Sequence, residues 1–122
     1  MHRAERLADT LLEEVSEIVG YELDDPRLDR VTVTDVRVAE NLRNANVYIL
    51  AEGSEQEIQS ALVALNHAAP FVRQQVALNM NLRYAPQLHF LRDTVEENAA
   101  RVDQLLDSME IPEENYDSGE EE

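Results

Sequence analysis

The chain lacks lysine, cysteine and tryptophan, and only three of its 122 residues are glycine. Without cysteine it has neither a disulfide framework nor thiolate chemistry. No apolar run approaches the roughly eighteen residues that a membrane span requires, so we expect a cytoplasmic protein. His2, His67 and His89 are scattered without ligand spacing, which predicts no metal site. Because no nucleophile–base pair or cofactor-binding motif occurs either, we expect neither an enzyme nor a cofactor.

Positive charge is also scarce. Ten arginines are the only fixed cations and face 26 aspartates and glutamates, giving a formal net charge of −16, which should repel nucleic acid. Arginine in place of every lysine and many surface carboxylates are typical of proteins that work in concentrated intracellular salt. We therefore hypothesise a salt-accumulating halophilic bacterium as the host. At about 1 M salt the Debye length is about 3 Å, so repulsion from a polyanion largely disappears beyond contact range.

One folded domain over residues 1–108, followed by an acidic tail over residues 109–122, is the expected organisation. The 43% of hydrophobic residues are enough for a single core. From Asp107 onward the chain has eight acids and no arginine. Such a segment cannot bury enough apolar surface to offset the entropy of ordering, so we predict a disordered tail.

Hydrophobic periodicity indicates an α+β fold that begins with a helix over residues 3–21. Apolar and polar residues alternate over residues 31–38 and 45–50, which predicts two strands of an antiparallel hairpin. The valines of the first strand switch parity in its middle, which predicts a β-bulge near Thr34 and Asp35. Residues 87–91 form a third predicted strand, and an apolar stripe from Thr94 to Met109 predicts a last helix.

The segment between the hairpin and the third strand has the strongest local signals. Ser54 and Glu57 form a capping-box pattern ahead of a helical stripe. Pro70 has no amide hydrogen, so we predict a kink at Ala68, Ala69 and Pro70, with a second helix continuing to about residue 80. The predicted order is therefore α-β-β-α-kink-α-β plus a C-terminal helix.

This order is similar to a type II KH-like domain, in which helices pack on one face of a three-stranded sheet. Short motifs make the resemblance more specific. Over roughly residues 3–108 the chain resembles the ribosome-binding factor A family through Arg3-x-x-Arg6-Leu7, Asp25-Pro26-Arg27-Leu28, Val33-Thr34-Asp35-Val36, Ala45-x-Val47-Tyr48, Phe71-Val72-Arg73, and Leu82-Arg83-x-x-Pro86-x-Leu88-x-Phe90 with Asp93.

The resemblance implies a non-enzymatic assembly factor that binds the free small (30S) ribosomal subunit late in maturation. It implies that the factor aids processing of the 5′ end of 16S rRNA and leaves before translation, with an assembly GTPase linked to its release. We expect a monomer. A different hypothesis is a protein-interaction module that keeps the KH-like scaffold and binds a protein through its acidic tail or last helix.

The chain departs from the family pattern in three ways. The family's usual Ala-x-Gly kink is Ala68-Ala69-Pro70 here, the usual aspartate after the first strand is Asn41, and the generally basic surface is largely absent. The G-x-x-G loop of ordinary KH domains is also missing, so any RNA contact must come from other surfaces.

The predicted RNA- and ribosome-binding residues are arginines and asparagines whose side-chain N–H groups could donate to phosphate and sugar. They are Arg3, Arg6, Arg43, Arg73, Asn79, Asn81 and Arg83. Each could instead be an ordinary surface residue, and Arg3 and Arg6 could pair with Glu5 or Asp9. Arg27 is expected to brace its turn against Asp24 or Asp29.

Overall fold

The computed structural model describes residues 3–97. The helix α1 (Arg3–Glu17) runs into a π-helical turn (Ile18–Glu22), and a short 3₁₀ turn (Pro26–Leu28) leads into the sheet. Strands β1 (Val31–Val38) and β2 (Asn44–Ala51) precede the long helix α2 (Glu55–Asn79) and strand β3 (Gln87–Arg92). Only the first turn of the predicted last helix, residues 94–97, falls within this range, and the predicted tail lies outside the described residues.

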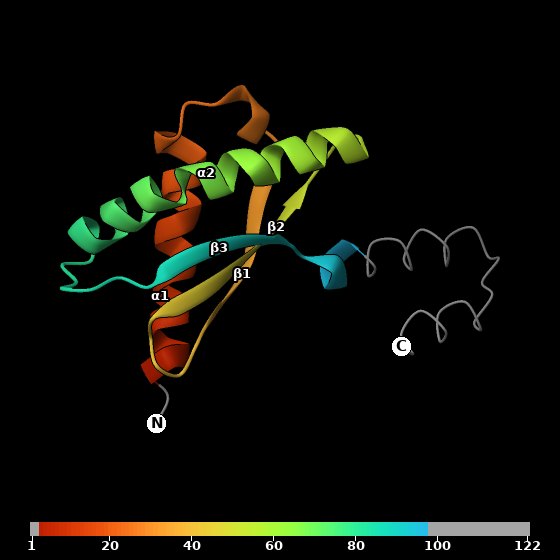
Figure 1. Cartoon of the computed structure of the whole chain (residues 1–122). Coiled ribbons are helices and arrows are strands. Elements are labelled where there is room, and N and C mark those ends of the chain that lie inside the picture. The colour runs from red at the N-terminus through yellow and green to blue at the C-terminus, as the bar shows by residue number, and fades with distance from the viewer. Residues whose placement is uncertain (1–2, 98–122) are drawn as a thin grey trace, which may run out of the picture.

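The sheet has the order β1-β2-β3, with β1 antiparallel and β3 parallel to β2. The parallel pairing requires a crossover, which α2 supplies while it runs alongside β3 (Figure 1). In the register of β1 and β2, Val33 faces Ile49 but Asp35 faces Tyr48, so Thr34 is the extra residue. The predicted β-bulge is therefore confirmed, and the valines on both of its sides pack against the core.

The core lies between the sheet and the two helices. Alternate residues of β2 and β3 point into it, and their neighbours Asn44, Gln87 and His89 are exposed, so the helices cover one face as predicted. The largest fully buried side chains come from every layer: Leu11, Val15, Ile18, Val47, Ile49, Leu65, Val72, Val76 and Pro86.

The second helix predicted to begin at Pro70 is not separate: α2 is one helix from Glu55 to Asn79 with Pro70 in its interior. The kink at Ala68, Ala69 and Pro70 stays a prediction. Leu65 before Pro70 and Val72 after it are both fully buried, whereas the proline ring is exposed. The side chain of Asn66 also holds the helix to the sheet edge, because Oδ1 accepts from Phe90 N at 2.9 Å and Nδ2 donates to Phe90 O at 3.1 Å. Packing on both sides outweighs the local cost of proline, about 3 kcal/mol.

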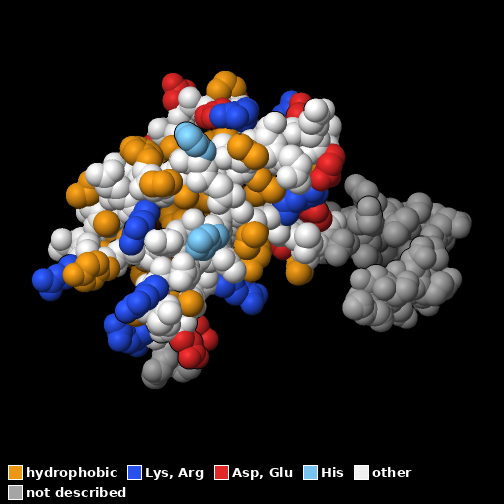
Figure 2. All heavy atoms as spheres, viewed as in Figure 1, with side chains coloured by type: hydrophobic (Ala, Val, Ile, Leu, Met, Phe, Trp, Pro, Cys, Tyr) orange, Lys and Arg blue, Asp and Glu red, His pale blue; other side chains and the backbone are white. Residues whose placement is uncertain are grey.

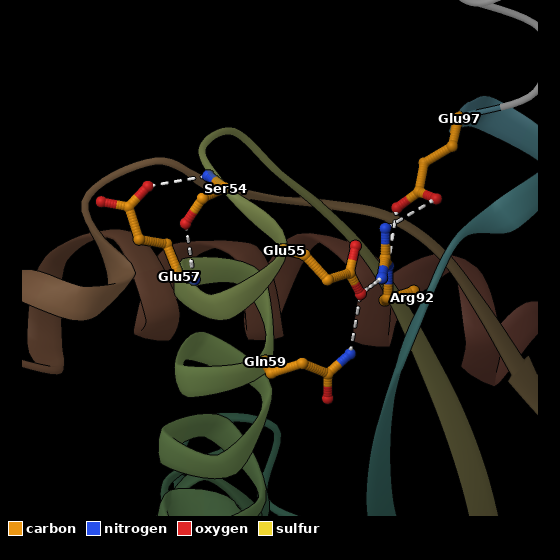
Figure 3. A network of polar contacts seen from close by, with 6 residues as sticks. All are labelled: Ser54, Glu55, Glu57, Gln59, Arg92 and Glu97. Atoms are coloured by element: carbon orange, nitrogen blue, oxygen red, sulfur yellow. Dashed lines mark hydrogen bonds and ion pairs between the residues drawn. The ribbon is translucent and has the colours of Figure 1, made fainter.

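Polar contacts fix both ends of this crossover. Ser54 and Glu57 form the predicted capping box, with Ser54 N donating to Glu57 Oε1 at 2.8 Å and Glu57 N donating to Ser54 Oγ at 3.1 Å (Figure 3). At the end of β3, Arg92 donates to Glu55 and, through two nitrogens, to Glu97 (Figure 3). These bonds, Glu97 first, raise the pKa of Arg92 and join the start of α2 to the end of β3.

Among residues 3–97, Asp93 is the buried charged residue, with 8% of its surface exposed. Burial opposes its ionisation, but donors from the Thr34 hydroxyl and the amides of Glu96 and Val95 together hold its pKa below the usual range. Asp93 thereby connects the bulge of β1 to the turn that follows β3. The bulge that the sequence indicated thus also anchors the exit of the chain from the sheet.

Candidate nucleic-acid interface

Residues 58–92 contain no aspartate or glutamate, although carboxylates are frequent before Ile58 and again from Asp93. The segment forms most of α2, the connecting loop 80–86 and β3. We call its exposed residues the acid-free face. Figure 2 shows acidic side chains mainly along the margins of this view, while apolar, uncharged and arginine side chains occupy most of the middle and left. A polyanion can approach this face without meeting a carboxylate of the segment that forms it.

The loop 80–86 is held firmly although part of it is exposed. Arg73 Nε donates to Ala85 O at 3.0 Å, and Leu82 N donates to Ala77 O at 2.9 Å. Ala85 and Pro86 are buried. Arg73 is therefore a loop-positioning residue that is only partly exposed, whereas Arg83 is exposed on the loop surface.

The turn between β1 and β2 lies next to this loop. Gln87 N donates to Arg43 O at 2.9 Å, which places the start of β3 beside the turn. Leu42 has a φ of 64°, and Arg43 N donates to Asn41 Oδ1 at 2.9 Å, so the turn is locally fixed. The side chain of Arg43 is exposed. Arg43 thus extends the acid-free face, to which Arg83 belongs, at one end of the sheet.

Arg3 and Arg6 occupy the first turns of α1 and are exposed. Figure 1 shows the start of α1 at the same end of the molecule as the turn between β1 and β2. Within the described residues, neither arginine forms the alternative ion pair with Asp9. Their contact with RNA stays a prediction, as it does for the other candidates.

The two amide candidates have structural contacts of their own. Asn79 Nδ2 donates to Glu14 Oε1 at 3.3 Å, which joins the end of α2 to α1. Asn81 follows the helix with a φ of 55°, in the left-handed region that asparagine tolerates at helix ends. Both are exposed, so these contacts leave part of each side chain accessible.

The opposite end of the molecule is unsuited to a polyanion. Arg27 braces the turn against Asp25 and not against Asp24 or Asp29, since Nε and Nη2 donate to the two Asp25 oxygens at 3.1 and 2.8 Å. The predicted partners Asp24 and Asp29 are therefore wrong, because the 3₁₀ turn brings Asp25 into this geometry. Its bonds from Arg27 lower the pKa of Asp25.

A hollow of about 710 Å³ lies at this end and is lined by Arg27 and Arg30 together with Asp29, Glu52 and Glu57. A second hollow, of about 760 Å³, lies between α2 and β3 and has no acid in its lining, which includes Val63, His67 and Leu91. The acid-free face therefore has the more favourable charge for a polyanion. In the described range, no group of three metal-ligating side chains and no helix long and apolar enough to cross a membrane occurs.

Sequence reasoning identified the arginines of this face but missed the feature that unites them. The absence of acids from residues 58–92 is visible in the sequence itself. Its meaning depends on the fold, because α2 and β3 must pack side by side before one run of sequence becomes one surface.

Comparisons with known proteins agree with this architecture. The family model described as ribosome-binding factor A matches residues 3–106. A protein of that name from Desulfitobacterium hafniense is 44% identical over 119 residues, which cover 98% of this chain and 94% of the relative. The crystal structure of ribosome-binding factor A from Thermus thermophilus has 30% identity and a TM-score of 0.65, covering 73% of this chain and 94% of that one.

A second solved structure is described as a homology model of the Thermus thermophilus factor fitted into the cryo-EM map of a 30S complex. It is 31% identical with a TM-score of 0.59, and the match covers 69% of this chain and 88% of that chain.

Proposed function

Because the chain belongs to the ribosome-binding factor A family, we propose that it binds the small ribosomal subunit through contacts with 16S rRNA and catalyses no reaction itself. The observation that carries the proposal is the acid-free face on a chain of net charge −16. There the turn that carries Arg43 bonds to Gln87, which directly follows the loop that carries Arg83. The description of the Thermus thermophilus factor in a 30S complex supports the partner.

The physical basis is local rather than global charge. At high salt the carboxylates elsewhere on the molecule are screened within a few ångströms, so their repulsion does not reach RNA on the acid-free face. The same screening weakens the gain from counterion release. Binding then depends on hydrogen bonds from the arginine forks and on shape, which a rigid loop and turn preserve.

Co-sedimentation with immature small subunits at matched high salt tests this proposal. We expect the wild-type chain to co-sediment and Arg43→Glu combined with Arg83→Glu to bind about a hundredfold more weakly, at roughly tenfold per charge-assisted contact. Neither side chain has a hydrogen bond to another described residue, so folding should be unaffected. Arg30→Glu changes the net charge at the acid-rich end as much as Arg83→Glu alone and leaves the contact between Arg27 and Asp25 intact, so comparison of these two single variants is the control.

Two results would count against the proposal. Absence of wild-type co-sedimentation would refute the function, and equal losses in Arg83→Glu and Arg30→Glu would refute the site, because total charge alone would then govern binding. Truncation after residue 108 examines the alternative protein-interaction function, since that function requires the acidic tail or last helix. Binding that disappears with the tail but survives both arginine variants would favour it.

We further propose that the factor acts late in maturation of the subunit in the cytoplasm, as a monomer, and promotes processing of the 5′ end of 16S rRNA before an assembly GTPase releases it. Cells depleted of the protein should accumulate 16S rRNA with an extended 5′ end, measured by primer extension. Normal maturation of that end during depletion would limit the function to binding.

The host environment can be examined on the purified chain. If the acidity is an adaptation to salt, far-UV circular dichroism should show a folded protein at about 3 M potassium chloride and a loss of helix at about 0.05 M, where surface carboxylates are far less screened. Equal spectra in both conditions would contradict the halophile hypothesis and leave the proposed binding face unchanged.

A further inference from the structure

Tyr84 is a large aromatic side chain that the fold does not use. It is 80% exposed and is absent from the side chains that pack on the core. Within the described residues its hydroxyl has no hydrogen-bond partner. Its position at the tip of a loop leaves the face of the ring available to an external ligand.

The loop that carries Tyr84 is ordered on both sides of the ring. Ala85 and Pro86, which follow it, are buried, and Arg73 holds the carbonyl of Ala85. Before the ring, Leu82 N bonds to Ala77 O at the end of α2. The backbone therefore needs little further ordering when a ligand meets Tyr84, which reduces the entropic cost of binding.

Arg83 gives the ring a cationic neighbour. Its guanidinium carbon lies 6.0 Å from the centroid of the Tyr84 ring. An aromatic face beside a planar cation is the pair of groups that proteins use for unpaired nucleotides, with the base stacked on the ring and the phosphate near the cation. No carboxylate occurs between Glu57 and Asp93 to oppose that phosphate.

We propose that Tyr84 stacks on an unpaired base of RNA while Arg83 contacts the adjoining phosphate. This inference rests on the proposed function and specifies the ligand of the same face. A protein surface could also cover an exposed ring, but charge favours RNA: the loop and the segment that carries it contain Arg73 and Arg83 and no carboxylate, and the carbonyl of Arg43 accepts from Gln87 N at the end of the loop. A base-paired helix is excluded as the ligand of the ring, because its bases have no free face.

The absence of tryptophan from the chain allows a direct spectroscopic test. Tyr84→Trp introduces a single indole on the loop, and we expect a short oligoadenylate to quench its fluorescence. Tyr21→Trp is the matched control, because Tyr21 is 85% exposed but lies beside Glu13, Glu14 and Glu17. Quenching at position 84 alone, with no effect of a duplex RNA of equal length, supports stacking. No quenching at position 84, or equal quenching at both positions, overturns it.

Binding to immature subunits then identifies the chemistry of the contact. We expect Tyr84→Ala and Tyr84→Leu to weaken co-sedimentation about tenfold and Tyr84→Phe to retain it, because phenylalanine keeps the aromatic face and leucine keeps only apolar area. Wild-type binding by the leucine variant would show that the loop docks on an apolar protein surface and would overturn the proposal. Failure of the wild-type chain to co-sediment would defeat the proposed function alone, since the indole signal reports on the RNA contact separately.

Discussion

Pro70 provides a sharp test of how α2 is held together. In the fold it is an exposed interior residue of one helix, so the carbonyl four residues earlier, at Asn66, lacks an amide donor. Pro70→Ala restores the donor and removes a helix-propensity cost of about 3 kcal/mol. The substitution also removes up to about 1 kcal/mol of stabilisation, because proline restricts the conformations of the unfolded chain. We therefore expect a net stabilisation of about 2 kcal/mol.

Urea unfolding at matched high salt, followed by far-UV circular dichroism, measures this change. With a denaturant slope of about 1–3 kcal/mol per molar, the midpoint should rise by about 1 M. Gln74→Ala, one turn further along and also exposed, is the control and should change stability by less than about 0.5 kcal/mol. If Pro70 were the first residue of a second helix, its missing donor would cost nothing. A midpoint equal to or below that of the wild type would therefore refute a continuous α2.

Three further predictions use the same assay. Gly53→Ala should destabilise the fold by about 1–2 kcal/mol, because φ of Gly53 is +129° and a new Cβ would lie 2.5 Å from Glu57 Oε1, which breaks the capping box. Gly20→Ala is the control and should be neutral or stabilising, because a Cβ there would have no atom within 4 Å. Asn66→Ala should cost about 1–2 kcal/mol by removing both bonds to Phe90, and an unchanged midpoint would show that these bonds are dispensable. Because the folded pKa of Asp93 lies below its unfolded value, its contribution is complete above about pH 4 and is lost as pH falls through the folded pKa. Asp93→Asn should flatten this part of the stability profile, and an identical acid dependence in both chains would contradict the assignment.

The features predicted correctly are those that local sequence determines. The parity switch of the valines located the bulge at Thr34, and Ser54 with Glu57 located the start of α2. The separate second helix after Pro70 was predicted wrongly because the deciding contacts are distant in sequence: Asn66 bonds to Phe90, and buried residues on both sides of Pro70 keep the helix continuous. Local propensity cannot include these contacts.

For the candidate site, too, local sequence identified some residues, and only the structure showed the others. Residue type and family motif were enough to select Arg43 and Arg83, and the structure leaves both exposed. They were not enough to show that Arg73 supports the loop through Ala85, a contact across twelve residues that depends on how α2 ends. Tyr84 had no signal in the sequence, since only the structure shows that its ring remains outside while its neighbours are buried.

The parallel pairing of β3 has a consequence for when the binding face exists. Asn44 pairs with Gln87 across the whole of α2, so this contact closes a long loop and is among the least local in the fold. The same pairing brings the turn of Arg43 next to the loop of Arg83. A chain in which β3 has detached can keep its hairpin and helices, but it separates the two arginines. Under the proposed function the subunit therefore binds only chains with a complete sheet, and by mass action its binding protects β3 from opening.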